Sequence, residues 1–314
     1  MRCVGDSDGP SDGGSDATTD VVVTDAATEA APTDAGGDAD ADVASKHAYA
    51  ANFSGSLLVF DMPLTSASQP TVVLTSNFKQ PSDIEIMPGG LQLLVVDGAG
   101  GNGPKLFVFD LPITASSVPV TAVSLDFQAI DASFDTDGNL WLAGFANKLE
   151  KLVLPLTTSS QPVQTITMPT GNLFGINVTS SDQLFVGGNG HLYHLTLPTD
   201  AGAYPDGGLD NQNIAAPTGI AYTNQALLIS NFSASVVDDL AVPIQSTTVP
   251  TPVGGTVLTS PTRLRFAPNG ALGVADAVRG IVMLDAPAFN TASVVVPAQD
   301  GGAVTDLRGI CFGP

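Results

Sequence analysis

The chain of 314 residues carries 31 acidic side chains and 10 Lys or Arg, which gives a formal net charge of −21 at pH 7. Nucleic acid and anionic membrane surfaces are bound through concentrated positive charge, so this composition excludes nucleic acid as a partner and argues against a membrane surface. With 43% hydrophobic residues and only two cysteines, the chain can bury a large core without a disulfide framework.

The first 46 residues differ in composition from the rest of the chain. They hold ten Asp and one Glu against Arg2 and Lys46, in a background of Ala, Gly, Ser and Thr. Such a segment has too little apolar surface to offset the loss of chain entropy on folding. We therefore predict that residues 1–46 form a disordered acidic tail or linker, and that residues 47–314 form one folded domain.

Cys3 precedes this acidic, Gly/Ser/Asp-rich linker and the globular domain that follows it. The arrangement is similar to the mature start of a bacterial lipoprotein, and that resemblance implies a lipid anchor at Cys3 and a place in the cell envelope. Met1 and Arg2 cannot serve as an apolar export signal. A removed signal, a missed upstream start and a coincidental cysteine all stay open as explanations.

From Pro63 onward a sequence pattern repeats every 43 to 49 residues. It consists of an apolar strand, a proline and a Ser/Thr-rich link. A fixed repeat of this length is typical of the four-stranded blades of a β-propeller. Its anchoring prolines are Pro63, Pro112, Pro155, Pro198, Pro243 and Pro287.

Two further strands recur in each repeat with the same spacing, and turn signals such as PGG and APNG separate them. Strands of alternating polarity begin near residues 82, 130, 174, 218, 262 and 308, and each is the first strand, a, of a unit. Second strands, b, end at Asn52, Asp97, Gly144, Gly188, Asn231 and Asp276. No helical periodicity follows residue 45, so the predicted fold is all-β.

The two ends of the repeat do not match, because the first unit lacks its strand a and the chain finishes with a lone strand a over 307–312. If that strand completes the first unit, the chain forms a six-bladed β-propeller of four-stranded antiparallel blades. The C-terminal strand then closes the ring on the N-terminal blade, which removes exposed sheet edges.

Residues 217–231 and 261–276 resemble the blades of NHL-repeat and gluconolactonase-like six-bladed propellers, whose text is close to P-x-G-I-A-V, D-G-N, L-Y-V-A-D. The resemblance implies the same fold. Gluconolactonase-like enzymes also bind a divalent metal through Glu and Asn/Asp near the starts of their inner strands. Those ligands lie in motifs such as P-N-G and P-D-G. Here Thr218 and Thr262 stand where the motif has Asn or Asp, and only Asp83 and Asp131 match it in part, one residue out of register. The metal site of that family is therefore not supported.

In each strand a, alternate residues are small or polar, and we expect these residues to line the central channel. Six blades place the sixth opposite the third, so we expect Arg263 to face Asp131 across the axis. This set forms either a plug of ion pairs or a pocket for a small polar ligand. Carboxylates suit a hard cation such as calcium, whereas guanidinium groups suit an anion. The candidate residues of this channel are Asp83, Glu85, Asp131, Asn177, Arg263 and Arg265.

Phe53, Phe145 and Phe232 directly follow strand b in alternate units. They line an apolar rim on the face formed by the b–c loops, or they cap the interiors of their own blades. The polar residues that end strand b should brace the next loop through backbone hydrogen bonds. The three histidines, His47, His191 and His194, form no nucleophile–base arrangement.

We therefore expect an extracytoplasmic binding or scaffolding propeller, in the cell envelope or secreted, and monomeric. Its ligand is an unidentified protein, glycan or small polar molecule on the b–c loop face, with no assigned catalytic residue, no cofactor and no transmembrane segment. The alternative is a metal-dependent hydrolase, lactonase or lyase, with calcium or another divalent cation held at Asp83, Glu85 and Asp131. An enzyme scaffold that has lost its ligand is a third possibility.

Overall fold

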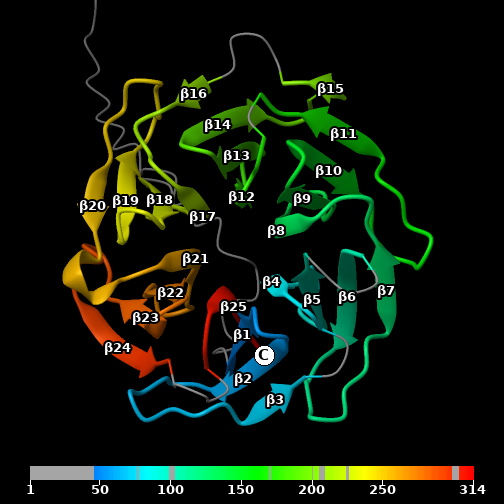
Figure 1. Cartoon of the computed structure of the whole chain (residues 1–314), viewed down its shortest axis with the longest axis vertical. Helices are drawn as coiled ribbons and strands as arrows, with labels where there is room; N and C mark the ends of the chain where they lie inside the picture. The colour runs from blue at the N-terminus through cyan, green and yellow to red at the C-terminus, as the bar shows by residue number, and fades with distance from the viewer. Residues whose placement is uncertain are drawn as a thin grey trace, which may run out of the picture. The chain divides into compact units, whose positions relative to one another are not determined.

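The computed structural model describes residues 46–314, except for 76–77, 99–102, 170, 200, 205–208, 224–225 and 299–303. These residues form six antiparallel blades around a central axis (Figure 1). The predicted disordered tail, apart from Lys46, and the predicted lipid anchor at Cys3 lie outside the described residues. The prediction of an all-β propeller is confirmed.

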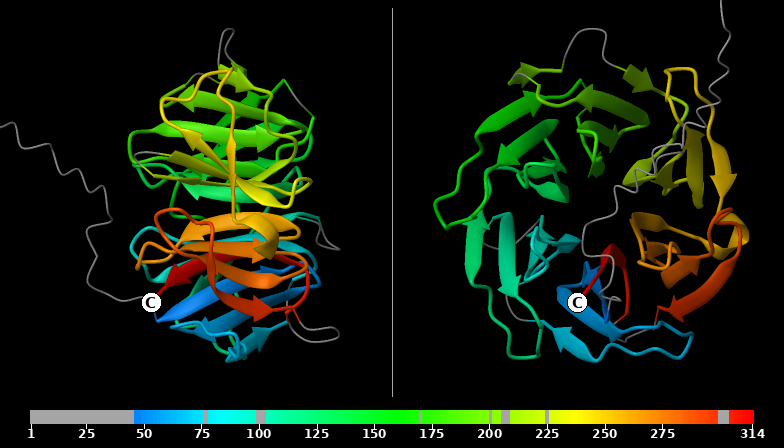
Figure 2. Two further views of the ribbon diagram at one scale, coloured as in Figure 1. Left: turned by 90° about the vertical axis from the view of Figure 1, so that its left-hand side faces the viewer. Right: turned by 180° about the vertical axis from the view of Figure 1, so that it is seen from behind.

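Each blade is built from strands a to d, ordered from the axis outward (Figures 1 and 2). Blade 1 contains β25 (Leu307–Gly313), β1 (His47–Asn52), β2 (Ser56–Asp61) and β3 (Val72–Leu74). Blade 2 contains β4 (Pro81–Ile86), β5 (Gln92–Asp97), β6 (Lys105–Asp110) and β7 (Thr121–Ser124). Blade 3 contains β8 (Ala129–Phe134), β9 (Leu140–Gly144), β10 (Lys148–Leu152) and β11 (Gln164–Thr167).

The second half of the ring repeats this order. Blade 4 contains β12 (Gly175–Val178), β13 (Gln183–Gly188), β14 (His191–Thr196) and β16 (Leu209–Asn211). Blade 5 contains β17 (Pro217–Tyr222), β18 (Ala226–Asn231), β19 (Val236–Ala241) and β20 (Thr251–Val253). Blade 6 contains β21 (Pro261–Phe266), β22 (Leu272–Asp276), β23 (Gly280–Leu284) and β24 (Ala292–Pro297). The additional strand β15 (Gly202–Ala203) pairs in parallel with β11, and a short 3-10 helix spans Gly255–Val257.

The ring closes where the C-terminal strand β25 pairs with the N-terminal strand β1. The pairing is antiparallel, and Ala50 lies opposite Ile310 in the register. The phenolic hydroxyl of Tyr49 also donates a hydrogen bond to the carbonyl oxygen of Pro314, at 2.7 Å. The first and last strands of the described residues therefore share one blade.

The core is divided into six apolar clusters, each packed between two neighbouring blades. Period-2 alternation directs one set of strand a side chains into these clusters. The members of that set are completely buried: Ile84, Ala132, Ile176, Ile220, Leu264 and Ile310. The opposite set faces the axis, so the core and the channel use alternate residues of the same strand.

The repeated proline pattern forms the link between strands c and d. All six anchoring prolines follow a cis peptide bond. Just after the proline, the N–H of Thr65 donates to the hydroxyl oxygen of Ser68 at 2.8 Å, and Thr114 and Thr157 make the same bond to Ser117 and Ser160. The Ser/Thr content of these links thus satisfies backbone groups of a tight turn.

The ring has two faces, and the strand directions define them. The loop face carries the b–c and d–a connections, and the hairpin face carries the a–b turns and the cis-proline links. Figure 1 looks onto the loop face, and Figure 2 adds a side view and the view from behind, where the C-terminus lies.

Polar residues at the ends of strand b hold the loop face together. Asp97 accepts hydrogen bonds from the N–H groups of Lys79 and Gln80, both at 2.8 Å. The Asp276 carboxylate accepts four backbone N–H bonds, from Thr259, Ser260, Val278 and Arg279. These residues therefore brace the d–a connection as well as the b–c loop.

Candidate functional site

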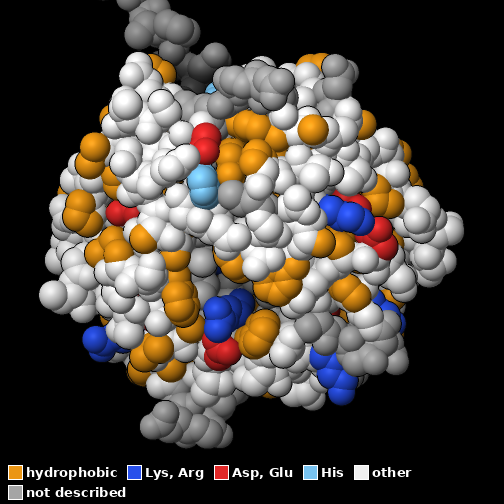
Figure 3. All heavy atoms as spheres, turned by 45° about the horizontal axis from the view of Figure 1, so that its top comes forward, with side chains coloured by type: hydrophobic (Ala, Val, Ile, Leu, Met, Phe, Trp, Pro, Cys, Tyr) orange, Lys and Arg blue, Asp and Glu red, His pale blue; other side chains and the backbone are white. Residues whose placement is uncertain are grey.

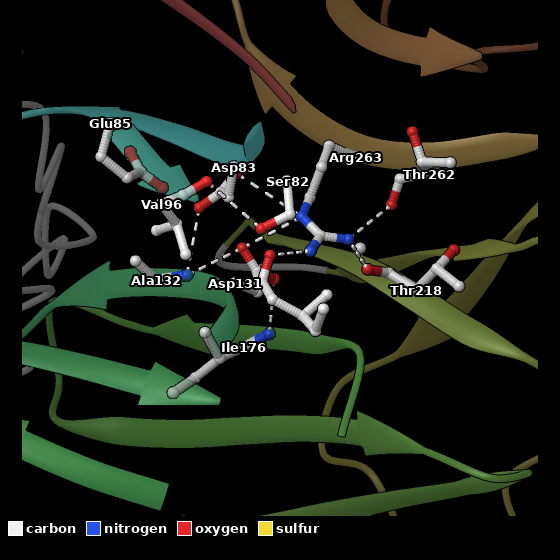
Figure 4. Close-up of polar contacts among 12 residues, drawn as sticks. Ser82, Asp83, Glu85, Val96, Asp131, Ala132, Ile176, Thr218, Thr262 and Arg263 are labelled. Carbon is white, nitrogen blue, oxygen red and sulfur yellow. Dashed lines mark hydrogen bonds and ion pairs between the residues drawn. The ribbon is translucent and has the colours of Figure 1, made fainter. Parts of the chain in front are cut away.

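The axis of the ring is filled by a buried charge cluster from three inner strands. Asp83 on β4, Asp131 on β8 and Arg263 on β21 point toward one another (Figure 4). Arg263 Nε lies 3.1 Å from Asp131 Oδ1 and 3.5 Å from Asp83 Oδ1. The exposed fractions are 0% for both carboxylates and 3% for the arginine. The sixth blade thus reaches the third across the axis.

The other three blades contribute glycine at the same level, and this makes room for Arg263. A Cβ atom at Gly219 would lie 2.5 Å from the carbonyl oxygen of Thr262, and one at Gly309 would lie 2.9 Å from the Cα of Asp83. The inner strands therefore approach too closely for further side chains. Arg263 crosses the gap, and its Nη2 donates to the carbonyl oxygen of Ile130 at 2.6 Å.

The two carboxylates also join neighbouring inner strands through backbone N–H groups. Asp83 Oδ2 accepts from the N–H of Ala132 at 3.1 Å, and Asp131 Oδ2 accepts from the N–H of Ile176 at 2.8 Å. Burial raises the pKa of Asp131 well above its usual range, Arg263 opposes this rise, and the nearby Asp83 adds to it. The Asp131 carboxyl group therefore holds a proton more readily than an isolated aspartate does.

A second layer of polar residues lies one position closer to the hairpin face. Arg265 Nη2 contacts Glu85 Oε1, and the two side chains are 15% and 16% exposed. Arg265 Nη2 is also 3.8 Å from Asp83 Oδ2, so the second layer is joined to the first. Asn177 is half-buried and pairs with Phe185 in the ladder between β12 and β13, and the structure shows no ion pair or side-chain hydrogen bond that joins it to the two arginines.

The chemistry open to this cluster is limited by its internal pairing. Both layers set carboxylates against guanidinium groups, and backbone N–H groups occupy further lone pairs. Within the described ranges, no group of three or more His, Cys, Asp or Glu side chains is placed to hold a metal ion. A cation at this position would meet two arginines, which oppose its charge.

The three phenylalanines after strand b separate into two groups. The Arg308 guanidinium carbon lies 5.1 Å from the ring centroid of Phe53 and 5.9 Å from that of Phe232. Phe145 instead packs edge-to-face on Phe174, with 5.9 Å between centroids. The sequence interpretation did not single out Arg308 or Phe174. The sequence does hold a signal for Arg308. It directly precedes Gly309, the residue of its strand a that faces the axis, and it is the one charged residue at this repeat position. The other blades carry Ser, Ile, Phe or Thr there.

The three histidines lie away from the axis, and each contacts a different side chain. His191 Nδ1 is 2.8 Å from Asp210 Oδ1, and His47 Nδ1 is 3.3 Å from Asp61 Oδ1. His194 contacts the side-chain oxygen of Gln183, and burial lowers its pKa. These separate pairs do not converge on one reactive atom, so they form no catalytic arrangement among the residues described.

Comparison with known proteins supports the fold alone. A solved crystal structure of a protein of unknown function from Bacteroides caccae is similar to this chain, with a TM-score of 0.64 and 11% sequence identity. The match covers 86% of this chain and 99% of that chain. No model of a known protein family matches, and no curated protein matches. The chain is a six-bladed β-propeller, and its likeness to NHL and gluconolactonase-like propellers stays a resemblance.

The part of the chain that the structure describes contains no helix long and apolar enough to span a membrane.

Proposed function

We propose that this protein is a non-catalytic binding propeller that works outside the cytoplasm and takes its ligand on the loop face. The observation that carries this proposal is the internal neutralisation of the axis cluster. Asp83 and Asp131 are buried against Arg263, and Glu85 is paired with Arg265. A general base or a metal ligand needs lone pairs that face a substrate, and Asp83 and Asp131 are completely buried against Arg263.

The distribution of charge supports the loop face as the binding surface. Half of the 10 Lys and Arg of this acidic chain lie on the loop-face connections or at the adjoining strand ends: Lys79, Lys105, Lys148, Arg279 and Arg308. Exposed or half-buried acids lie on both faces: Asp61, Asp110, Asp137, Asp182 and Asp285 on the hairpin face, and Asp126 and Asp306 on the loop face, where they pair with Lys148 and Arg308. Figure 3 looks at a slant onto the loop face and shows basic side chains at several places on it. Loops held on a rigid frame are also the usual position for binding residues.

The alternative proposal, a metal-dependent hydrolase or lyase, requires Asp83, Glu85 and Asp131 to turn toward a cation. This change would break their contacts with Arg263 and Arg265 and leave two largely buried arginines with backbone carbonyl oxygens but no carboxylate partner. Breaking a buried ion pair costs about 3–5 kcal/mol. The geometry therefore favours binding over catalysis.

A thermal melt of the full chain with calcium, other divalent cations and chelator separates the two proposals. A ligand that binds only the folded state stabilises it by about 2.7 kcal/mol at a hundredfold excess over its Kd. We expect no change in Tm with any cation or with chelator. A rise in Tm that Asp131→Ala abolishes would contradict the binding proposal and support the enzyme.

The position of the ligand is tested by comparing one variant on each face. Glycans, small acids and candidate protein partners are screened against the full chain, Phe232→Ser on the loop face and Asp137→Ser on the hairpin face. The proposal expects binding that Phe232→Ser weakens and Asp137→Ser does not. Loss of binding in Asp137→Ser alone would place the ligand on the hairpin face.

A further inference from the structure

Arg308 occupies an unusual position at the mouth of the channel on the loop face. It lies at the start of β25 in blade 1, yet its guanidinium group contacts Phe53 of blade 1 and Phe232 of blade 5. The contact therefore passes over the inner end of blade 6. The Arg308 side chain is 33% exposed, so its outer edge meets solvent.

Asp306 fixes the orientation of this guanidinium group. Arg308 Nε donates to Asp306 Oδ1 at 2.7 Å. Asp306 has a φ of 47°, in the left-handed region, and backbone hydrogen bonds hold it there on both sides. Its N–H donates to the carbonyl oxygen of Ala277 in blade 6, and its carbonyl oxygen accepts from the N–H of Phe53 in blade 1, both at 3.1 Å. The group is thus preorganised by three blades.

The end of the guanidinium group that faces outward has no partner of its own. Across the described ranges, Arg308 Nη1 and Nη2 have no hydrogen-bond acceptor, because the one polar contact of this side chain is made by Nε. Two parallel N–H donors in a plane match the two oxygens of a carboxylate. The rings of Phe53 and Phe232 also attract the guanidinium group and help to hold it in place.

The charges around Arg308 favour one negative charge over several. Asp306 offsets part of its charge, and the whole chain carries −21, which repels polyanions. Lys79 on the connection from blade 1 to blade 2 and Arg279 on the β22–β23 loop of blade 6 also lie on the loop face, and neither has an ion pair with any described acid. A monovalent carboxylate fits this balance better than a phosphate does.

We propose that Arg308 binds the carboxylate of a ligand through Nη1 and Nη2, while Phe53 and Phe232 contact the apolar side of a sugar or aromatic ring that carries it. This inference rests on the proposed binding function and names its ligand class, a ring-bearing carboxylate such as a uronic acid or an aromatic acid. Phe232 is 36% exposed, which leaves part of its ring free for that contact.

The test is a calorimetric titration of the full chain with matched pairs of probes. Galacturonate is compared with galactose, and benzoate with benzyl alcohol, so that each pair differs in the carboxylate. We expect the acids to bind and their neutral counterparts not to bind. Tighter binding of galacturonate assigns a glycan source, and tighter binding of benzoate assigns a small aromatic acid. Inorganic phosphate that binds more tightly than either acid would overturn the assignment to a carboxylate.

Variants distinguish recognition by the two planar N–H donors of Arg308 from general attraction between charges. Arg308→Gln should weaken binding of the acids at least tenfold, and Arg308→Lys should weaken it by a similar factor because an ammonium group lacks two planar donors. Arg279→Gln removes a cation from the same face and should change affinity less than threefold. Each variant is first shown to keep the Tm of the parent chain within a few degrees.

Two results would overturn the inference. The first is binding of galacturonate or benzoate that survives Arg308→Gln unchanged, and the second is no binding of either acid to the parent chain. If a ligand found on the loop face binds Arg308→Gln as tightly as the parent chain, this inference fails and the proposed function stands. A metal-dependent rise in Tm with no loop-face ligand would instead remove the proposed function.

Discussion

Arg263 is the residue on which the packing of the channel axis depends. Its guanidinium group lies between Asp83 and Asp131, and both carboxylates are fully buried. Burial and the neighbouring Asp83 both disfavour the ionised form of Asp131, and Arg263 stabilises it. The arginine thus permits three blades to place charged residues at a level where the other three have only glycine.

We predict that Arg263→Met destabilises the fold far more than Asp131→Asn does. The methionine leaves Asp83 and Asp131 buried without a cation, and losing one partner of a buried ion pair costs about 3–5 kcal/mol. Asparagine keeps an oxygen to accept from the N–H of Ile176 and replaces a carboxyl group whose pKa is already raised. The free energy of unfolding of each variant is measured in urea. Equal losses in the two variants would contradict this account.

Glu150 is another buried acid, and it lies in the interface between blades 2 and 3. Its side chain is 2% exposed, its Oε2 has no hydrogen-bond partner, and Lys148 Nζ is 3.6 Å from its Oε1. Burial raises the pKa of Glu150 to about 7, Asp126 adds to the rise, and Lys148 opposes it. Between the unfolded-state value near 4.5 and about 7, the folded protein retains a proton that the unfolded chain releases.

This difference in proton binding makes the folded state less stable as pH rises from about 4.5 to 7. We predict that Glu150→Gln removes this loss, so the variant gains stability over the parent chain at pH 8, by at most about 3 kcal/mol at 1.36 kcal/mol per pKa unit. At pH 4.5 the two proteins should be nearly equal. Thermal melts at both pH values, with Asp137→Asn as a surface control, measure the effect. A gain that does not depend on pH would refute the assignment.

At the scale of single elements, the six inner strands form one unit although they do not pair as a sheet. Side chains of one strand bind the backbone of the next: Asp83 to Ala132, Asp131 to Ile176, and Ser133 to Val178. Thr262 continues the pattern, because its hydroxyl donates to the carbonyl oxygen of Leu307 at 3.0 Å. These bonds need a close approach of neighbouring strands, and glycine at the axis provides it.

We predict that Gly219→Ala disrupts this approach and lowers the free energy of unfolding by about 1–3 kcal/mol, the usual cost of overpacking a tight core. The new Cβ would lie 2.5 Å from the carbonyl oxygen of Thr262 and 2.8 Å from the Cα of Arg263, both backbone atoms that cannot rotate away. Gly171→Ala is the matched control, because a Cβ there would have only an ordinary 3.8 Å contact with Asn189 Nδ2. Similar losses in both variants would show that strand spacing is not the cause.

The sequence predicted strands and their register well, because both follow from local periodicity repeated six times. Counting the blades was enough to place Arg263 opposite Asp131. Contacts between loops could not be predicted in this way, because they depend on the lengths and paths of the connections. Phe53, Phe145 and Phe232 share one repeat position, yet the first and last contact Arg308, whereas Phe145 contacts Phe174. The parallel pairing of β15 with β11 was missed for the same reason.

At the scale of the whole molecule, the two faces of the ring differ in charge while the axis between them is closed by buried ion pairs. Half of the basic residues lie at the loop face, whereas acids lie at both faces, so the positive charge open to an anionic ligand is concentrated on one face of an otherwise acidic protein. The plug formed by Asp83, Asp131 and Arg263 separates these faces. Arg308 itself is held by Asp306, Phe53 and Phe232 on the loop-face side.

The last strand should matter to the whole ring more than its seven residues suggest. Strand β25 supplies strand a of blade 1, and its Leu307 and Ile310 belong to the apolar cluster between blades 6 and 1. Cys311 belongs to the cluster between blades 1 and 2, and the hydroxyl of Thr262 in blade 6 donates to the carbonyl oxygen of Leu307. Removing β25 would open two of the six blade interfaces and expose the edge of β1.

We therefore predict that a chain ending at residue 305 unfolds at a much lower temperature than the full chain, or fails to give a single cooperative transition. Circular dichroism melts and size-exclusion chromatography report the two effects, since an exposed strand edge also promotes association. Adding a synthetic peptide of residues 304–314 should restore part of the lost Tm, because it can pair with β1 in the native register. An unchanged Tm in the truncated chain, or no response to the peptide, would show that the ring does not depend on closure by β25.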